Sequence, residues 1–302
     1  MALVGFPSVG KSTLLSEMTD TESNAAAYAF TTVTAIPGNI FYHGATIQML
    51  DLPGIIEGAA YGKGRGRQVI SAAKTSDMIL LMLDATKGDV QKELLLNELY
   101  MCGIRVNKRP PNVTITIKDK GGVAFNSTVP QTSLDPQLVR EILRDQKINN
   151  ADINAHEDIT VDDFIDALHI KHRKYLPCLF VYNKIDELVV EEVDRLAALP
   201  HHLVISSRLG WNLDVLVEEI WLALDLVRIY TKRRGADPNL TEALVLSREH
   251  NTILDVCRAI HKDFEKSFKM ANVWGRSAKH SPQKVGLHHR LEDEDVVELI
   301  RV

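Results

Sequence analysis

Apolar residues in the first part of the chain form short runs that are separated by polar stretches. Continuous apolar runs are typical of strands that helices cover on both faces. A helical spacing of apolar residues follows over 90–102. This alternation predicts an α/β domain built around a parallel sheet. Its strands are expected at 2–4, 46–50, 77–84 and 178–182.

A stretch of roughly seventy residues interrupts the alternation between Gly103 and Pro177. A connection inside a βα unit needs only a few residues, so we expect an inserted subdomain here. The insert is predicted to be a small α/β unit as well. Its pattern indicates a strand at 113–117, a second strand at 123–125 that returns from the first as a hairpin, and helices at 138–143 and 162–168.

The last part of the chain has a third pattern. A helix is predicted from Gly210 to about Leu226, and we expect Trp211 and Trp221 to be anchors in the core or between domains. Beyond this helix, the order strand, strand, helix, strands is that of a ubiquitin-like β-grasp module. These elements are expected at 226–230, 243–246, 252–261 (with Thr252 as a candidate cap) and 296–300.

The three patterns divide the chain into three parts. We assign residues 1–103 and 176–226 to the first domain, 104–175 to the insert and 227–302 to the C-terminal module. A length of 302 residues allows about two domains, and a hydrophobic content of 45% supports a real core.

The cysteines and the lack of long apolar runs indicate where in the cell the protein is expected. Cys102, Cys178 and Cys257 are far apart and have no C-x-x-C spacing, which is typical of core thiols in a reducing compartment. No apolar run reaches the length of a membrane span, and no signal-like start is visible. We therefore expect a cytoplasmic protein that does not associate with a membrane.

Charge is distributed unevenly along the chain. The formal net charge of −5 gives no global sign of nucleic-acid binding. Residues 228–291, however, hold 13 lysines and arginines against 6 acidic residues, and an acidic cluster follows at 292–295. Such a basic module suits RNA or a ribosomal surface, although the solvated surface of a small domain is the competing interpretation.

The sequence Gly-Phe-Pro-Ser-Val-Gly-Lys-Ser at 5–12 fits the phosphate-binding pattern G-x-x-x-x-G-K-[ST]. Its glycines let backbone N–H groups surround phosphate oxygens, and the following helix adds its positive end. Lys11 can reach the β- and γ-phosphates, and Ser12 offers a hydroxyl to Mg²⁺. The predicted nucleotide-binding residues here are Gly5, Pro7, Ser8, Val9, Gly10, Lys11, Ser12 and Thr13.

A second motif, Asn183-Lys184-Ile185-Asp186, predicts which base is bound. The Asp186 carboxylate can accept hydrogen bonds from the ring N–H and the exocyclic amine of guanine, a donor pair that adenine lacks. The apolar stem of Lys184 can lie along the base, and Asn183 can brace the phosphate loop. Ser206 and Ser207 resemble the segment whose backbone N–H groups meet the guanine oxygen. We therefore expect GTP or GDP as the ligand.

A third motif, Asp51-Leu52-Pro53-Gly54, predicts metal binding and a switch. Asp51 would hold Mg²⁺ through water, and the Gly54 N–H would contact the γ-phosphate of GTP but not GDP. A threonine before Asp51 should complete the metal shell, and we favour Thr32 over Thr31. The predicted metal group is Ser12, Thr32 and Asp51, and the predicted catalytic group is Lys11, Thr32 and Gly54.

These motifs together resemble the Obg superfamily of GTPases, through the runs at 5–13, 30–32 and 51–59. The C-terminal runs at 261–264, 273–275 and 291–297 are similar to the developmentally regulated GTP-binding proteins, the DRG or Rbg branch. The resemblance covers nearly the whole chain. It implies a P-loop GTPase (G) domain, a small α/β insert, and a β-grasp module of the TGS type that docks to ribosomes or RNA.

The resemblance also raises two expectations about features outside the motifs. Family members carry a helical region before the P-loop strand, whereas only residues 1–4 precede Gly5, so we expect a shortened first strand in a truncated chain. The family further implies a dedicated regulatory protein partner, whose contact surface no residue of this sequence identifies.

The position after Gly54 bears on the rate of hydrolysis. Many GTPases have a water-orienting glutamine there, but this chain has Ile55, which cannot orient or deprotonate water. We therefore expect slow hydrolysis unless another group assists the reaction. Relatives imply two ways to accelerate hydrolysis: K⁺ bound at the phosphates, or a partner that orders the switches. For the first of these, Ser8 stands where some K⁺-using relatives have asparagine.

The motifs thus predict hydrolysis of GTP to GDP and phosphate by a translation-associated factor on or near ribosomes. Two alternatives stay open. Ile55 favours a nucleotide-gated module that binds ribosomes or RNA, with incidental turnover. An ATPase is the second alternative, against which the intact Asn183 and Asp186 argue.

Overall fold

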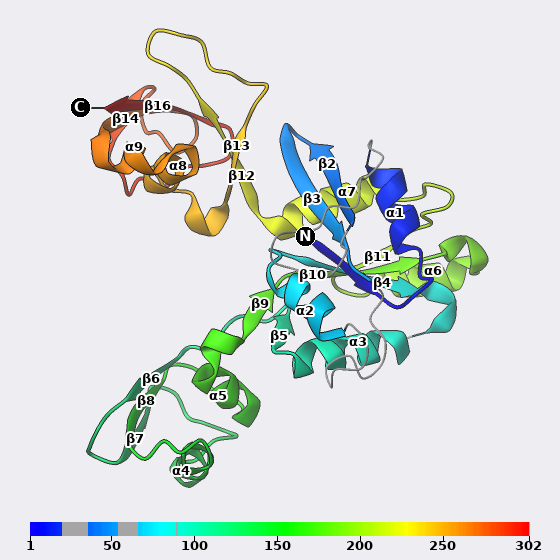
Figure 1. Ribbon diagram of the computed structural model, residues 1–302, viewed down its shortest axis with the longest axis vertical. Coiled ribbons are helices and arrows are strands. Elements are labelled where there is room, and N and C mark those ends of the chain that lie inside the picture. Colours follow the sequence, from blue (N-terminus) through cyan, green and yellow to red (C-terminus); the bar gives the residue numbers. More distant parts are fainter. Residues whose placement is uncertain (20–35, 54–65, 89, 302) are drawn as a thin grey trace.

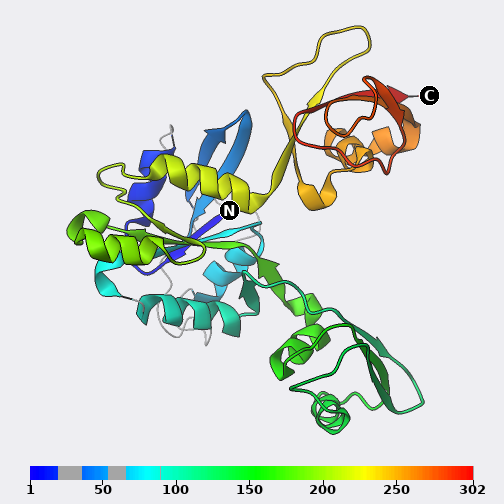
Figure 2. The same ribbon diagram turned by 180° about the vertical axis from the view of Figure 1, so that it is seen from behind.

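The computed structural model describes residues 1–19, 36–53, 66–88 and 90–301. Thr32, Gly54 and Ile55 lie outside these ranges. The chain forms three parts, each with its own sheet, and the G domain lies between the insert and the C-terminal module (Figures 1 and 2). The predicted α/β architecture of P-loop domain, insert and β-grasp module is confirmed.

The G domain contains a six-stranded sheet in the order β11-β10-β4-β1-β3-β2. All neighbouring pairs are parallel except β2 with β3, which form an antiparallel hairpin. The strands are β1 (Ala2–Gly5), β2 (Ile36–Tyr42), β3 (Ala45–Asp51), β4 (Ile79–Asp84), β10 (Cys178–Asn183) and β11 (His202–Val204). The carboxyl ends of the parallel strands therefore meet at one edge, where ligands of such sheets bind.

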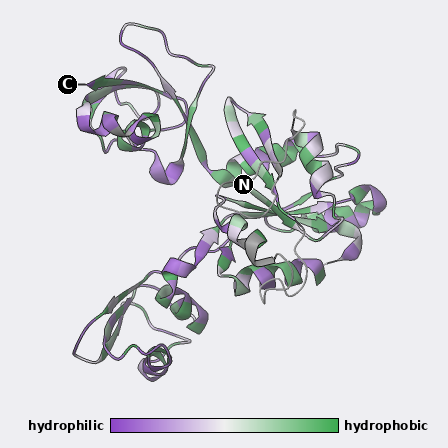
Figure 3. Ribbon diagram, viewed as in Figure 1, coloured by the Kyte–Doolittle hydropathy of each residue, from purple (hydrophilic) through white to green (hydrophobic). Residues whose placement is uncertain are grey.

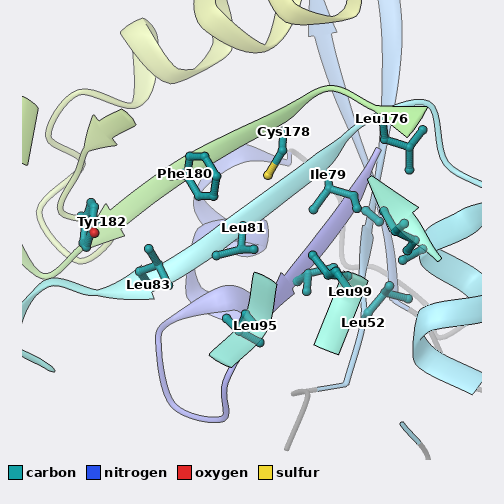
Figure 4. Close-up of a cluster of buried hydrophobic side chains, with 14 of the residues drawn as sticks. Leu52, Ile79, Leu81, Leu83, Leu95, Leu99, Leu176, Cys178, Phe180 and Tyr182 are labelled. Atoms are coloured by element: carbon teal, nitrogen blue, oxygen red, sulfur yellow. The ribbon is translucent and has the colours of Figure 1, made fainter. Parts of the chain in front are cut away.

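Helices cover both faces of this sheet (Figure 1). One face carries α1 (Lys11–Met18) and α7 (Leu213–Leu224), and the other carries α2 (Gly66–Lys74), α3 (Val90–Met101) and α6 (Val190–Ala197). Every residue of β4 is buried because its side chains alternate between the two cores. Leu80 and Met82 pack on the α1 and α7 side, while Ile79, Leu81 and Leu83 pack on the other (Figure 4).

The hydropathy of the chain follows this layering. Apolar residues concentrate in the central strands of the G domain, and the helices around them also carry hydrophilic residues (Figure 3). Within the described ranges, none of the helices combines the length and the apolar character that crossing a bilayer requires.

The insert is joined to the G domain by two short parallel strands, β5 (Ile104–Val106) and β9 (Lys174–Leu176). Its own sheet has the order β6-β8-β7, and two helices contribute to its core. These elements are β6 (Val113–Ile117), β7 (Val123–Ser127), α4 (Pro136–Asp145), β8 (Ala151–Ala155) and α5 (Val161–Leu168), and the 3₁₀ turn η2 (Ile170–His172) leads back.

The hairpin predicted for the insert is wrong. Both strands exist, but β8 lies between them, antiparallel to β6 and parallel to β7. Ala151, Ile153 and Ala155 are fully buried, whereas the neighbouring side chains of β8 are only half-buried. The apolar face of β8 therefore lies at the centre of the sheet, whereas β8 would lie at an edge if β6 paired directly with β7.

Buried charges fix α5 of the insert to the connecting strand β5. Arg105 on β5 donates two hydrogen bonds to Asp166 on α5, at 2.5 and 2.7 Å, and its guanidinium lies over the Tyr100 ring. Arg173 adds a bond of 2.6 Å to the same carboxylate. Burial alone would raise the pKa of Asp166, but the two arginines outweigh it and hold the pKa below its ordinary value.

Removal of this carboxylate is expected to destabilise the insert strongly. In Asp166→Ala, the Arg105 guanidinium, 3% exposed, loses its counter-charge, a change that costs about 3–5 kcal/mol in buried pairs. Urea unfolding followed by circular dichroism, with hydrogen exchange to localise the change, measures this loss. Arg109→Ala is the control, because its side chain is 85% exposed, and it should shift stability by less than about 0.5 kcal/mol. Equal shifts in the two variants would contradict the role of the buried cluster.

The C-terminal module is a five-stranded sheet in the order β13-β12-β16-β14-β15, packed against α8. A capping box begins α8, in which Thr252 and Asp255 satisfy each other's backbone N–H groups. The parallel pairing of β12 with β16 produces the predicted β-grasp order. The elements are β12 (Leu226–Thr231), β13 (Leu244–Ser247), η4 (Arg248–His250), α8 (Ile253–Ile260), α9 (Lys262–Ser267), β14 (Phe268–Trp274), β15 (Gln283–Val285) and β16 (Asp295–Arg301).

A single residue, Asp225 with φ of 45°, joins α7 to β12. Beyond it, Arg228 bonds Asp293 of the module at 2.6 Å and the backbone oxygen of His43 in the G domain at 3.4 Å. Trp221 on α7 lies beside this arginine, 5.6 Å from its guanidinium, and is an interdomain anchor as predicted. Trp211 is 51% exposed, so its assignment as an anchor is wrong.

Candidate nucleotide site

The phosphate loop connects β1 to α1 at the carboxyl edge of the sheet. Ser8 and Gly10 have φ of 62° and 98°, so the backbone turns through the left-handed region twice before α1 begins at Lys11. A side chain at Gly10 would lie 2.3 Å from the Asn183 amide nitrogen, which requires glycine there. Val9 is buried under the loop, whereas Pro7, Ser8, Ser12 and Thr13 are exposed.

Lys11 is folded back over this loop. Its ammonium donates to the backbone oxygens of Phe6 at 2.9 Å and Gly5 at 3.3 Å, and the residue is only 8% exposed. Burial lowers the pKa of Lys11, and the Asp51 carboxylate offsets part of that shift. A buried ammonium held by neutral carbonyl oxygens is poorly compensated, so an anion beside the loop would be stabilised.

Asp51 lies at the end of β3, where its Oδ2 accepts a hydrogen bond of 2.7 Å from Ser12. Its Oδ1 is buried and has no hydrogen-bond partner within the described part of the chain. Burial raises the pKa of Asp51 more than Ser12 and Lys11 lower it. A hydroxyl and an unsatisfied carboxylate oxygen are ligands of the kind that hard divalent cations such as Mg²⁺ prefer.

Asn183, the last residue of β10, links three segments. Its amide donates to the Val9 oxygen at 2.9 Å and accepts from the Ser207 N–H at 2.9 Å. The phosphate loop, β10 and the loop before α7 are therefore held together by one buried side chain. This is the brace between motifs that the sequence predicts, formed between residues 174 positions apart.

Lys184 adopts a left-handed conformation with φ of 70° and pairs with Asp84 at 2.7 Å. Burial tends to raise the pKa of Asp84, but bonds from Lys184 and Thr86 outweigh it and the net shift is downward. Sequence reasoning did not include Asp84. Its position at the end of β4 could have identified it, because sheet pairing aligns it with Asn183.

Asp186 is a nearly buried carboxylate, 6% exposed, at the predicted base end of the site. Its Oδ1 accepts from Ser206 at 2.6 Å and its Oδ2 from Arg208 at 2.5 Å. The Ser206 hydrogen bond is the main reason that the pKa of Asp186 lies below its ordinary value. Arg208, which is 72% exposed, is a second residue that sequence reasoning did not single out.

The structure thus brings most of the predicted site residues to one edge of the sheet. The phosphate loop with Lys11 and Ser12 lies beside Asp51, and Asn183 connects it to the segment that contains Ser206 and Ser207. The hydroxyl of Ser207 is buried and has no hydrogen-bond partner in the described ranges. The predicted contacts of Thr32 and Gly54 fall on residues outside those ranges.

Comparison with known proteins covers all three parts of the chain. Residues 1–118 match the family model described as a 50S ribosome-binding GTPase, and residues 120–226 match the C-terminal region of that domain. Residues 227–301 match the TGS domain. The chain also resembles the solved YchF GTPase of Schizosaccharomyces pombe, at 13% identity and a TM-score of 0.50, over 99% of this chain and 97% of that one. This last similarity shows the fold alone.

Full-length similarity to curated relatives identifies the branch. The chain is 57% identical to GTP-binding protein 1 of Schizosaccharomyces pombe over 300 residues, which is 99% of this chain and 82% of that protein. It is 54% identical to developmentally-regulated GTP-binding protein 2 of Mus musculus over 301 residues, again with 82% of the relative covered. The chain therefore belongs to the developmentally regulated GTP-binding proteins, and it combines a GTPase domain with a TGS domain.

Proposed function

We propose that this protein binds GTP with Mg²⁺ at the edge of the G-domain sheet and hydrolyses it to GDP and phosphate. The observation that carries the proposal is the link through Asn183, which joins the phosphate loop to the loop beside Asp186. One ligand with a polyphosphate tail and a base fits such a linked pair of subsites. A nucleoside triphosphate has this form.

The base end supports guanine in particular. The Asp186 carboxylate is ionised and accepts two hydrogen bonds, from Ser206 and Arg208, so a base that donates two N–H groups fits its acceptor capacity. Adenine would leave part of it unpaired, which disfavours the ATPase alternative. The Ser206 and Ser207 N–H groups already donate to the Trp211 oxygen and to Asn183, so a guanine oxygen would have to share one of these donors.

The phosphate end supports a metal-assisted reaction. Ser12 and Asp51 would hold Mg²⁺, together with Thr32, and the cation would neutralise charge on the phosphate oxygens. Lys11 would bind the β- and γ-phosphates, and the Gly54 N–H would contact the γ-phosphate. Because Ile55 cannot orient water, we propose slow turnover that K⁺ or a partner stimulates.

The cellular role is proposed on separate grounds. The matched family model is described as ribosome-binding, the module at 227–301 is a TGS domain, and residues 228–291 are basic. These features favour a cytoplasmic, translation-associated factor that docks to ribosomes or RNA through its C-terminal module. A regulatory protein partner of the kind that the family implies is part of the same proposal.

Single-turnover phosphate release tests the enzyme against a nucleotide-gated binding module. We expect slow release from GTP in Na⁺ buffer and an acceleration of about ten-fold or more on adding K⁺ or ribosomes, since extra positive charge or ordered switches stabilise the transition state. Ribosome co-sedimentation in the same samples reports docking. Release at background in every condition would favour the binding module, and lack of co-sedimentation would contradict the ribosomal role.

A further inference from the structure

Arg208 pairs with the carboxylate that is proposed to bind the base. Its guanidinium donates to Oδ2 of Asp186 at 2.5 Å, while Ser206 donates to Oδ1 at 2.6 Å, so both carboxylate oxygens are engaged. A guanine that presents its ring N–H and exocyclic amine to this carboxylate requires access to both oxygens. Ser206 can stay, because each carboxylate oxygen has room for more than one donor. The bulkier guanidinium is bound to Oδ2, so it would compete with a base N–H for that oxygen.

The geometry of the loop lets this arginine leave without disturbing the site. Ser206 and Trp211 exchange backbone hydrogen bonds at 3.3 and 3.1 Å, and Ser207 is fixed to Asn183. The backbone that carries Arg208 is therefore held, whereas its side chain is 72% exposed and can turn into solvent. Within the described ranges, Asp186 is the only carboxylate that forms an ion pair with it.

We propose that Arg208 is an internal competitor for the base subsite, which pairs with Asp186 in the nucleotide-free protein and must be displaced when a guanine nucleotide binds. The inference rests on the proposed role of Asp186 as the base-reading residue. The competitor keeps the carboxylate paired between ligands and lowers both the association rate and the affinity for guanine nucleotides. Ion pairs with an exposed partner are weak, so the effect is a tuning of about two- to five-fold.

Stopped-flow binding of a fluorescent mant-GDP to the full chain tests this proposal. Arg208→Ala should raise the association rate constant and the affinity by about two- to five-fold. Arg208→Lys should lie nearer the wild type, because an ammonium still pairs with the carboxylate but lacks the planar fork. The difference between wild type and Arg208→Ala should shrink as NaCl rises from about 50 to about 500 mM, because salt screens exposed charge pairs.

Two controls separate the competitor from general charge effects. Arg195→Ala removes the same charge from an exposed ion pair with Glu192 on α6, away from the base subsite, and should leave mant-GDP binding unchanged. In an Asp186→Asn background the arginine loses its partner. Adding Arg208→Ala there should therefore not accelerate binding of mant-xanthosine diphosphate.

The possible outcomes are distinct. Arg208→Ala rates equal to those of Arg195→Ala would overturn the competitor, and weaker binding would show instead that Arg208 contacts the ligand. Either result, with Asp186→Asn still changing base preference, would leave the base-reading role of Asp186 intact. If Asp186→Asn had no effect on base preference, both the base-reading role of Asp186 and the competitor role of Arg208 would be contradicted.

Discussion

Asp186→Asn is expected to change the preferred base from guanine to xanthine. Xanthine carries a carbonyl where guanine carries its exocyclic amine, and the introduced amide donates where the carboxylate accepted. A mismatch is costly, since in Asp186→Asn a donor of the protein would face a donor of guanine. We expect the ratio of the dissociation constants for GDP and xanthosine diphosphate to change by about 100-fold or more.

Equilibrium titration with both mant-labelled diphosphates measures this switch. Asp194→Asn makes the same chemical change at an exposed position on α6 and should leave the ratio as it is in the wild type. Circular dichroism checks that both variants are folded. An Asp186→Asn protein that still prefers guanine would remove this carboxylate from the base subsite.

Lys11→Ala is expected to weaken binding of the triphosphate by about 100-fold and to bring hydrolysis to background. The Lys11 ammonium is buried against carbonyl oxygens, so a phosphate would supply its missing counter-charge in a site with little water. The loss should be larger for a GTP analogue than for GDP, because the side chain reaches the γ-phosphate as well as the β-phosphate.

Isothermal titration calorimetry with a non-hydrolysable GTP analogue and with GDP gives both affinities. Lys120→Ala removes the same charge from an exposed turn of the insert and serves as the matched control. If Lys11→Ala bound the analogue as tightly as that control does, the phosphate loop would have another role.

The clustering of the candidate site residues was largely predictable because these residues follow strands that the apolar runs mark. Parallel strands bring their carboxyl ends to one edge, so motifs far apart in the chain converge there once the strands are recognised. Asp84 was missed because it belongs to no contiguous motif. Its partner Lys184 becomes visible only when the sheet order places β4 beside β10.

The insert shows the limit of local patterns. Two strands with a glycine turn between them suggested a hairpin, yet β8 enters between them from more than twenty residues further along the chain. Its burial depends on helices that share a core with Ala151, Ile153 and Ala155, a tertiary effect that outweighs the turn. Arg208 was missed for a related reason, since an exposed arginine after a serine pair has no distinctive spacing.

Because a single residue connects α7 to β12, a movement of the helix is passed directly to the first strand of the TGS domain. The loop of Ser206 and Ser207 precedes α7, and the TGS domain follows directly after Asp225. A twelve-residue helix is about 18 Å long, so a tilt of a few degrees at its first turn displaces its far end by about an ångström. A one-residue connection is too short to bend and compensate for such a tilt, so the TGS domain would move with the helix.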